Sequence, residues 1–191
     1  MIFIKEIKDY AWQIKSFDSE DWMIYFIWIG LMMGLFFSVA IFLYTGFSNG
    51  VKYPAYVWNI PLGILTFALA IGFDTIGHRT TYKEELKKAE ALVHHITIFA
   101  GITSTILLCL AYSFPVFLRI PCAVLIFLSV LYSVIDEGFH WHRYWRLKSD
   151  RVEMTSHFFI FVGHMTMIFA WWKWFDEGYL GVKETLTAMG F

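Results

Sequence analysis

Four short stretches of this sequence place an acidic residue and a histidine at the same spacing. They are Asp74 with His78, Glu90 with His94, Asp136 with His140, and Glu153 with His157. Residues four apart lie on one face of a helix, one turn apart, so each stretch can aim a carboxylate and an imidazole at one point. Carboxylates and imidazoles together suit iron or manganese better than a soft thiolate metal. The repeated spacing therefore predicts a metal site.

The elements that must position these pairs are those of a membrane protein. The chain is 58% hydrophobic and 16% charged, with a mean hydropathy of +0.56. Crossing a bilayer takes about 20 helical residues, and the stretches that approach this length are 22–46, 56–79, 93–114, 120–145 and 154–174. We therefore predict an all-α, multi-pass membrane protein with five transmembrane helices. Pro61 and Pro121 are expected in the first turns of the second and fourth spans.

The other segments complete this organisation. Residues 1–21 alternate apolar and charged positions at helical spacing, which predicts an interfacial helix. The first span, 22–46, contains no charged residue or histidine, so it can face lipid all round. A net charge of -1 without a long basic run excludes a nucleic-acid partner. Cys109 and Cys122 are expected to be small buried hydrophobes, because their spacing does not match a metal motif.

The last four spans are predicted to form a bundle of two helical hairpins, 56–114 and 120–174. The acids within the two hairpins are 16 and 17 residues apart, from Asp74 to Glu90 and from Asp136 to Glu153. The stretch AEALVHHITIFAG also aligns with VEMTSHFFIFVGH, with the acid and the first histidine in register. These regularities indicate a duplicated hairpin. Alternating span direction then places all four acid and histidine pairs at one depth.

Basic residues predict on which side of the membrane the acid and histidine pairs lie. Arg79, Lys83, Lys87, Lys88, Arg143, Arg146, Lys148 and Arg151 all lie in or beside the connections 78–92 and 141–153. The opposite connections contain only Lys52 and Arg119. By the positive-inside rule, the N-terminus and the metal site are expected to be cytoplasmic, and the tail 175–191 extracytoplasmic.

All seven histidines belong to the last four spans. A cluster of carboxylates in a membrane would repel itself without cations, and bound metal relieves both that repulsion and the desolvation. An arginine-compensated polar network or a haem are the open alternatives. The first expected ligands are Glu90, His94, Asp136, His140, Glu153 and His157. Further ligands, or groups that orient ligands, are Asp74, His78, Glu137, His95 and His142. Tyr132 and His164 are predicted to line a route from the site toward the midplane.

The predicted site resembles two known classes of metalloprotein. Glu137, Gly138, Phe139 and His140 match the Glu-x-x-His motif of ferritin-like di-iron carboxylate proteins, while the other pairs have one more intervening residue. At class level, the chain is similar to the histidine-rich integral-membrane di-iron hydroxylases and desaturases. The adjacent His94 and His95, and His140 with His142, are the features nearest to their histidine boxes, although HxxxH and HxxHH boxes themselves are absent. The resemblance implies two iron ions, with manganese, zinc or copper as alternatives.

These features predict an oxygen-dependent oxidoreductase that acts on a lipid or other hydrophobic substrate by hydroxylation, desaturation or quinol oxidation. The sequence has no HExxH motif, which would indicate a metalloprotease. It also has no GxGxxG motif, which would indicate a nicotinamide or flavin domain. Electrons are therefore expected from a separate donor protein. The rival functions are a metal-ion transporter, a haem-binding quinone-linked cytochrome subunit, and an accessory subunit of a larger complex. The substrate and the oligomeric state are left open by the sequence.

Overall fold

The structure is a computed structural model that describes residues 2–81, 88–147 and 151–191, with side chains except at positions 2, 88–91 and 147. The elements are α1 (Ile2–Trp12), η1 (Gln13–Ser16), α2 (Ser19–Ser48), η2 (Ala55–Trp58), α3 (Asn59–Arg79), α4 (Lys88–Leu110), α5 (Pro115–Leu147), α6 (Arg151–Asp176) and α7 (Val182–Ala188). Within the described ranges there is no strand, as predicted.

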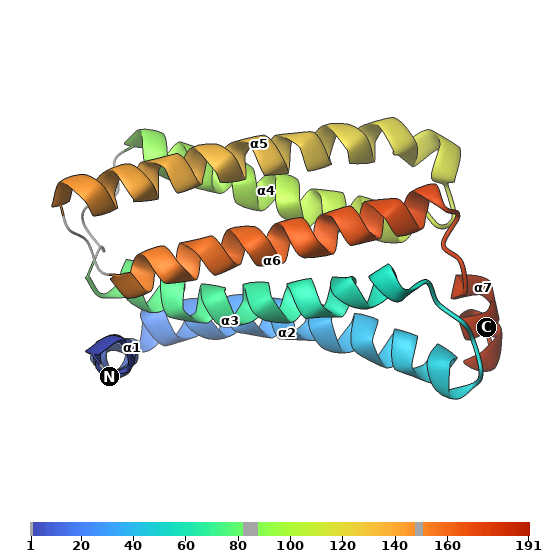
Figure 1. The fold of residues 1–191 in the computed structure, drawn as a ribbon, viewed down its shortest axis with the longest axis horizontal. Helices are drawn as coiled ribbons and strands as arrows, with labels where there is room; N and C mark the ends of the chain where they lie inside the picture. The colour runs from blue at the N-terminus through green and yellow to red at the C-terminus, as the bar shows by residue number, and fades with distance from the viewer. Residues whose placement is uncertain (1, 82–87, 148–150) are drawn as a thin grey trace.

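Five helical segments are long and apolar enough to cross a membrane, which confirms the predicted number of spans. They are Ser19–Ser48, Ala55–Arg79, Leu92–Leu110, Pro115–Arg146 and Arg151–Asp176. The long helices run roughly parallel or antiparallel, and the two termini lie at opposite ends of the long axis (Figure 1). Pro61 lies in the first turn of α3, as expected. Pro121 does not begin a helix, because α5 already starts at Pro115, whose fixed φ and missing N–H suit a first helical position.

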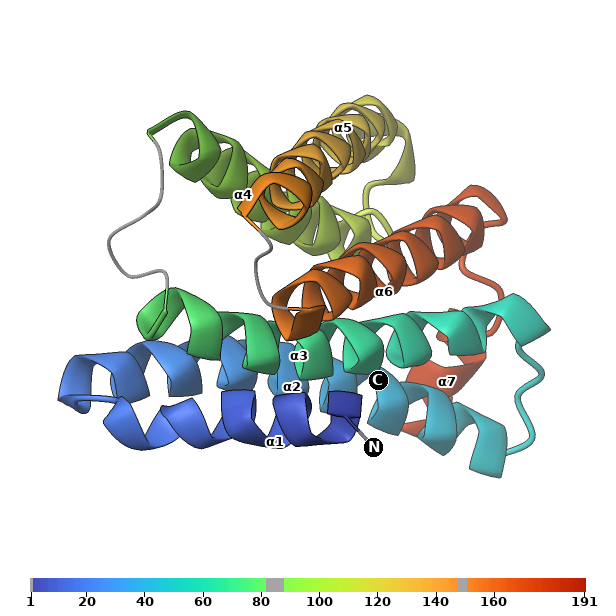
Figure 2. The same ribbon diagram turned by 60° about the vertical axis from the view of Figure 1, so that its left-hand side comes forward.

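The bundle is layered. The most extensive helix contacts are those of α3 with α6 and of α4 with α5, followed by α2 with α3 and α5 with α6. Figure 2 shows α4 and α5 on one side of the α3 and α6 layer and α2 on the other. Half of the α2 residues are exposed, but Leu43 is fully buried and Leu35 and Phe36 pack against the core. One face of the first span therefore packs on α3, and only its remaining surface is free to contact lipid.

Helices α3 and α6 cross at two glycines. A Cβ added to Gly163 would lie 2.6 Å from the Phe67 backbone nitrogen, and one added to Gly63 would lie 2.6 Å from that of Met167. Real Cβ atoms do not approach backbone this closely, so only glycine permits this crossing. Small residues bring membrane helices into backbone contact in the same way. This crossing fixes how α3 and α6 are placed relative to each other.

The N-terminal helix lies across the bundle rather than along it. In Figure 1, α1 is seen end-on while the long helices run across the page. Tyr10 and Phe17 are buried in a second apolar cluster with Ile76 and Val152, which attaches this segment to α3 and α6. The helix expected over residues 1–21 is shorter in the structure, because α1 ends at Trp12 and α2 already begins at Ser19.

The opposite end of the bundle is closed by the tail. Helix α7 packs on α2, and Thr185 hydrogen-bonds Tyr53 in the loop before α3. Glu177 accepts a hydrogen bond from Tyr56, and Asp176 pairs with Arg119. Residues 175–191 therefore form a packed cap rather than a free tail.

An ion pair connects the start of α2 to the end of α3, and it yields a stability prediction. Asp21 is buried, caps the first turn of α2 through the Asp18 backbone nitrogen, and accepts from Arg79 Nε at 2.5 Å. Asp21→Ala should lower the free energy of unfolding by about 1.5–3 kcal/mol, the range for hydrogen bonds to charged groups. Glu20→Ala is the matched control, because Glu20 contacts the same arginine at 3.1 Å from an exposed position. Equal effects of the two substitutions in thermal unfolding in detergent would contradict this account.

Candidate metal centre

The four predicted pairs come from helix ends that meet at one end of the bundle. Asp74 and His78 lie in the last two turns of α3, and Asp136 and His140 lie toward the end of α5. His94 and His157 lie near the starts of α4 and α6. These ends are grouped on the side of the bundle where α1 lies (Figure 1). The sequence-based expectation of one common depth agrees with this placement.

Two groups of side chains have the geometry to hold a metal ion. One consists of Asp74, His78 and His157, and the other of Asp136, His140 and His157. In each group, one ligand atom from every residue lies within 4.8 Å of the others. Each group contains one carboxylate and two imidazoles. His157 belongs to both, so it lies between the two groups.

The shortest contact within these groups joins two helices. His157 Nε2 of α6 is 2.8 Å from Asp74 Oδ1 of α3, and His78 Nε2 is 3.4 Å from the same oxygen. Two donor atoms bound at about 2.1 Å to one ion are roughly 3.0 to 3.4 Å apart at octahedral or tetrahedral angles. On the other pair of helices, His94 Nδ1 of α4 is 3.5 Å from Asp136 Oδ2 of α5. His140 Nε2 is 4.0 Å from Asp136 Oδ1.

Several buried ligand atoms lack a hydrogen-bond partner among the described residues. They are Asp74 Oδ1, His78 Nε2, Asp136 Oδ1 and His157 Nε2. His157 Nε2 and Asp74 Oδ1 are close enough for a hydrogen bond, but their angles do not meet its geometry. Buried polar groups are almost always paired, and one cation in each of the two groups would give these atoms a partner. The side chains present therefore fit a metal ion.

The two central histidines constrain the charge of the cluster. The rings of His140 and His157 are stacked with centroids 3.3 Å apart, and both residues are buried. Two imidazolium ions at that distance would repel by about 5 kcal/mol at an effective dielectric of 20. At least one ring is therefore neutral, and neutral imidazole is the form that binds metals.

Among the described residues of the cluster, acidic side chains outnumber arginine. Asp74, Asp136 and Glu153 are buried, and Glu137 lies 3.8 Å from His157. Arg143 donates to Glu153 at 3.0 Å. With ionised acids and neutral histidines, these five side chains carry a net charge of about -3, which is costly in a low-dielectric bundle. Two divalent cations would more than offset that charge.

Glu153 is positioned to orient a histidine. Its Oε1 atom is 3.3 Å from His140 Nδ1 and 3.0 Å from Arg143 Nη1. The other ring nitrogen of His140 is thereby directed toward Asp136. A carboxylate behind a metal-binding histidine fixes the tautomer and the ring orientation. Glu153 belongs to neither group of three among the described residues, and its predicted place among the first ligands stays a prediction.

Other predicted site residues lie elsewhere. His95 and His142 are exposed, and neither belongs to the two groups among the described residues. The side chain of Glu90 lies outside the described part of the chain, as do Lys83, Lys87 and Lys148 of the predicted cytoplasmic connections. Tyr132 is half-buried and is not a member of either group. His164 is buried deeper in the bundle, where its Nδ1 lies 3.3 Å from Ser133 Oγ.

Sequence reasoning missed four contributors. Arg143 was explained as a positive-inside residue, yet it pairs with Glu153. Ser133 lies one turn before Asp136 and Glu137, which places it on the same face of α5. That shared face was the available signal for Ser133, which contacts His164. Gly63 and Gly163 lie 100 residues apart, and nothing in their local sequence indicates that they face each other.

Removing the carboxylate of Glu153 tests its supporting role. Glu153→Gln should weaken metal binding by about 10- to 100-fold while the number of ions bound at saturating metal stays the same. Titration of metal-depleted protein, followed by elemental analysis, measures both quantities. Glu184→Gln is the control, because Glu184 is exposed in α7 at the opposite end of the bundle. A reduced number of ions at saturation would instead make Glu153 a direct ligand.

Comparisons with protein-family models, with curated proteins and with solved structures found no match to this chain. Its functional assignment therefore depends on the chemistry and geometry of the site itself.

Proposed function

We propose that this chain is a membrane-embedded di-iron oxidoreductase that uses dioxygen to modify a lipid or other hydrophobic substrate. The observation that carries the proposal is the pair of groups that each combine two histidines with one aspartate, all of them buried except the half-buried His78. Two histidines and one carboxylate with open coordination positions are typical of non-haem iron oxygenases. Five candidate spans and largely exposed apolar helix surfaces support a hydrophobic substrate.

We also propose that the bundle arose from a duplicated hairpin, with α3 equivalent to α5 and α4 to α6. A two-fold relation between such repeats would pair α3 with α6 in the same way as α5 with α4, and these are the two most extensive helix contacts. Asp74 meets His78 and His157 as Asp136 meets His140 and His94. This correspondence supports two equivalent ion sites, each with one aspartate and two histidines. His94 would then take at Asp136 the place that His157 takes at Asp74, while His157 also reaches the second group.

The chain's own residues would hold the ions and control their surroundings. Iron, when bound, supplies the reduction of dioxygen, and the electrons would come from a separate donor protein. Asp74 and Asp136 would provide negative oxygen ligands, while Glu153 would keep His140 in one tautomer. The burial of Asp74, Asp136, His140 and His157 would limit the access of bulk water to the site. We further propose that this end of the bundle is cytoplasmic, from the basic residues Arg79, Arg143, Arg146 and Arg151 beside it.

Elemental analysis and an optical spectrum of the same purified sample test the proposal. We expect about two iron ions per chain, and oxygen consumption by the chemically reduced protein. A folded protein free of iron after growth in iron-rich medium would overturn the iron assignment, and manganese, zinc or copper at the same stoichiometry would replace it. A Soret band would instead identify a haem protein. Metal uptake into liposomes that contain the pure protein would identify a transporter.

A further inference from the structure

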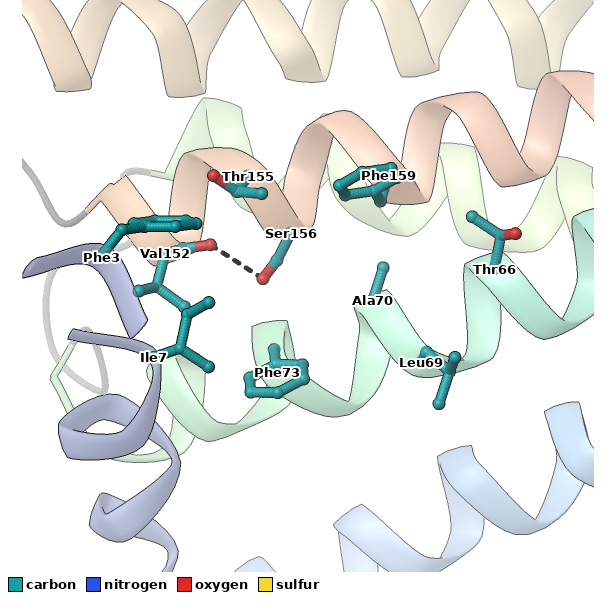
Figure 3. Close-up of a pocket in the computed structure, with 10 residues that line it drawn as sticks. All are labelled: Phe3, Ile7, Thr66, Leu69, Ala70, Phe73, Val152, Thr155, Ser156 and Phe159. Atoms are coloured by element: carbon teal, nitrogen blue, oxygen red, sulfur yellow. Dashed lines mark hydrogen bonds between the residues drawn. The ribbon is translucent and has the colours of Figure 1, made fainter. Parts of the chain in front are cut away.

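A separate apolar cavity lies beneath the N-terminal helix. It has a volume of about 340 Å³ and is lined by α1, α3 and α6. Figure 3 shows Phe3 and Ile7 of α1 at one end, and Thr66 of α3 and Phe159 of α6 at the other. The remaining lining residues are Leu69, Ala70, Phe73, Val152, Thr155 and Ser156.

The cavity wall offers hydrocarbon and almost no polar chemistry. Its three hydroxyl groups are already used by their own helices. Thr66 donates to Leu62 O at 2.9 Å, Thr155 to Arg151 O at 2.8 Å, and Ser156 to Val152 O at 2.9 Å. The Ser156 bond is drawn in Figure 3. A ligand that needs hydrogen bonds would lose them on entry, so the wall favours an alkyl chain.

The length of the cavity suits part of one alkyl chain. The lining extends over eight residues on each helix, from Phe73 to Thr66 and from Val152 to Phe159, which corresponds to about 10 Å along the axis.

The outer side of the cavity faces the bilayer, and an ion pair lies at its α1 end. Leu69 and Phe159 at its rim are 61% and 44% exposed on the outer surface of helices that are apolar enough to span a membrane. At the α1 end, Arg151 pairs with Glu6 and lies 5.9 Å above the Phe3 ring. A lipid chain can therefore enter from the side, with its polar end kept at the charged end.

The cavity is distinct from the metal centre. Phe73 and Ser156 line it, whereas the next residues, Asp74 and His157, belong to the metal groups. Consecutive helical residues project about 100° apart. A chain in the cavity would therefore lie on the flank of α3 and α6, and not among the ligands.

We propose that this cavity is a binding site for a single alkyl chain of a membrane lipid, which seats α1 on α3 and α6. The proposal does not depend on the function of the metal centre. One chain would fill the space that α1 covers and would contact all three helices at once. The α1 helix would then be held by lipid in addition to its own buried side chains Tyr10 and Phe17.

Photolabelling of the full chain in nanodiscs tests this proposal. The probe is a phosphatidylcholine with a diazirine in the middle of one acyl chain, and labelled residues are located by mass spectrometry. We expect labelling of Phe73, Phe159 or their neighbours at least fivefold above that of Phe37 and Ile41, which are exposed on α2. Labelling at or below the level of these α2 residues would overturn the proposal, because it would indicate only annular lipid.

Cavity-filling variants provide the second test. Ala70→Phe and, from the α1 side, Ile7→Trp should each reduce the cavity labelling at least fivefold, with the metal content unchanged. Ile7→Trp does not alter α3 or α6, so it retains the test where Ala70→Phe fails to fold. Val124→Phe on the exposed surface of α5 is the control and should leave the labelling unchanged. Undiminished labelling in folded Ile7→Trp protein would overturn the proposal.

Discussion

Replacing His157 with alanine should remove most of the bound metal. His157 is buried and is the only histidine common to both candidate groups in the described part of the chain. Its Nε2 atom lies 2.8 Å from Asp74, and its ring stacks on that of His140. Loss of a residue that merely orients a ligand reduces metal affinity by 10- to 100-fold, so loss of this one should cost about 100-fold or more. Elemental analysis after dialysis against a weak chelator measures the effect.

His142→Ala is the matched control for this substitution. His142 is a histidine of the same helix as His140, but it is exposed. Its replacement should leave the metal content within error of the unmodified protein. If both variants bind metal equally well, the shared position of His157 has no role in binding, and the two-group site is wrong.

The His157 variant should also distinguish two hypotheses for the cluster, a metal site and a protonated polar network without metal. Asp74 would lose its closest partner, and added metal would no longer stabilise the protein against heat. Metal that binds only the folded state raises stability in proportion to the logarithm of its concentration. A network without metal predicts no such dependence in either protein, and thermal unfolding with and without added iron distinguishes the two cases.

Gly163→Ala should disrupt both the fold and the metal centre. The added Cβ would lie 2.6 Å from the Phe67 nitrogen and 2.8 Å from the Gly63 oxygen, and backbone atoms of a helix cannot move alone. Overpacking of this kind typically costs about 1–3 kcal/mol. Because α3 and α6 would have to separate, the contact of Asp74 with His157 should open, and metal binding should weaken with stability.

Two other glycines give controls for this prediction. Gly138 of α5 lies between Glu137 and His140, and Gly34 lies in α2, and neither added Cβ would meet an atom within 4 Å. Alanine is the better helix former by about 1 kcal/mol, so both substitutions should be neutral or stabilising. Thermal unfolding and metal content, measured on all three variants, test the contrast. A Gly163→Ala protein as stable as Gly138→Ala would show that the crossing tolerates a methyl group.

The sequence by itself determined the membrane helices and the end at which the acids and histidines gather. Span length follows from bilayer thickness, and span direction alternates, so Asp74, Asp136 and His157 had to fall at one depth. The i, i+4 spacing also correctly predicted contacts within one helix, such as Asp74 with His78.

Only the tertiary structure decided which helices are neighbours and which side chains meet. The placement of α3 against α6 depends on close packing at Gly63 and Gly163, which are distant in sequence and carry no local signal. That packing brings His157 to Asp74 and leaves Glu153 facing His140 and Arg143. Local spacing fixes only the face of a helix on which a residue lies, while the partner of that face is chosen by the fit of two helix surfaces.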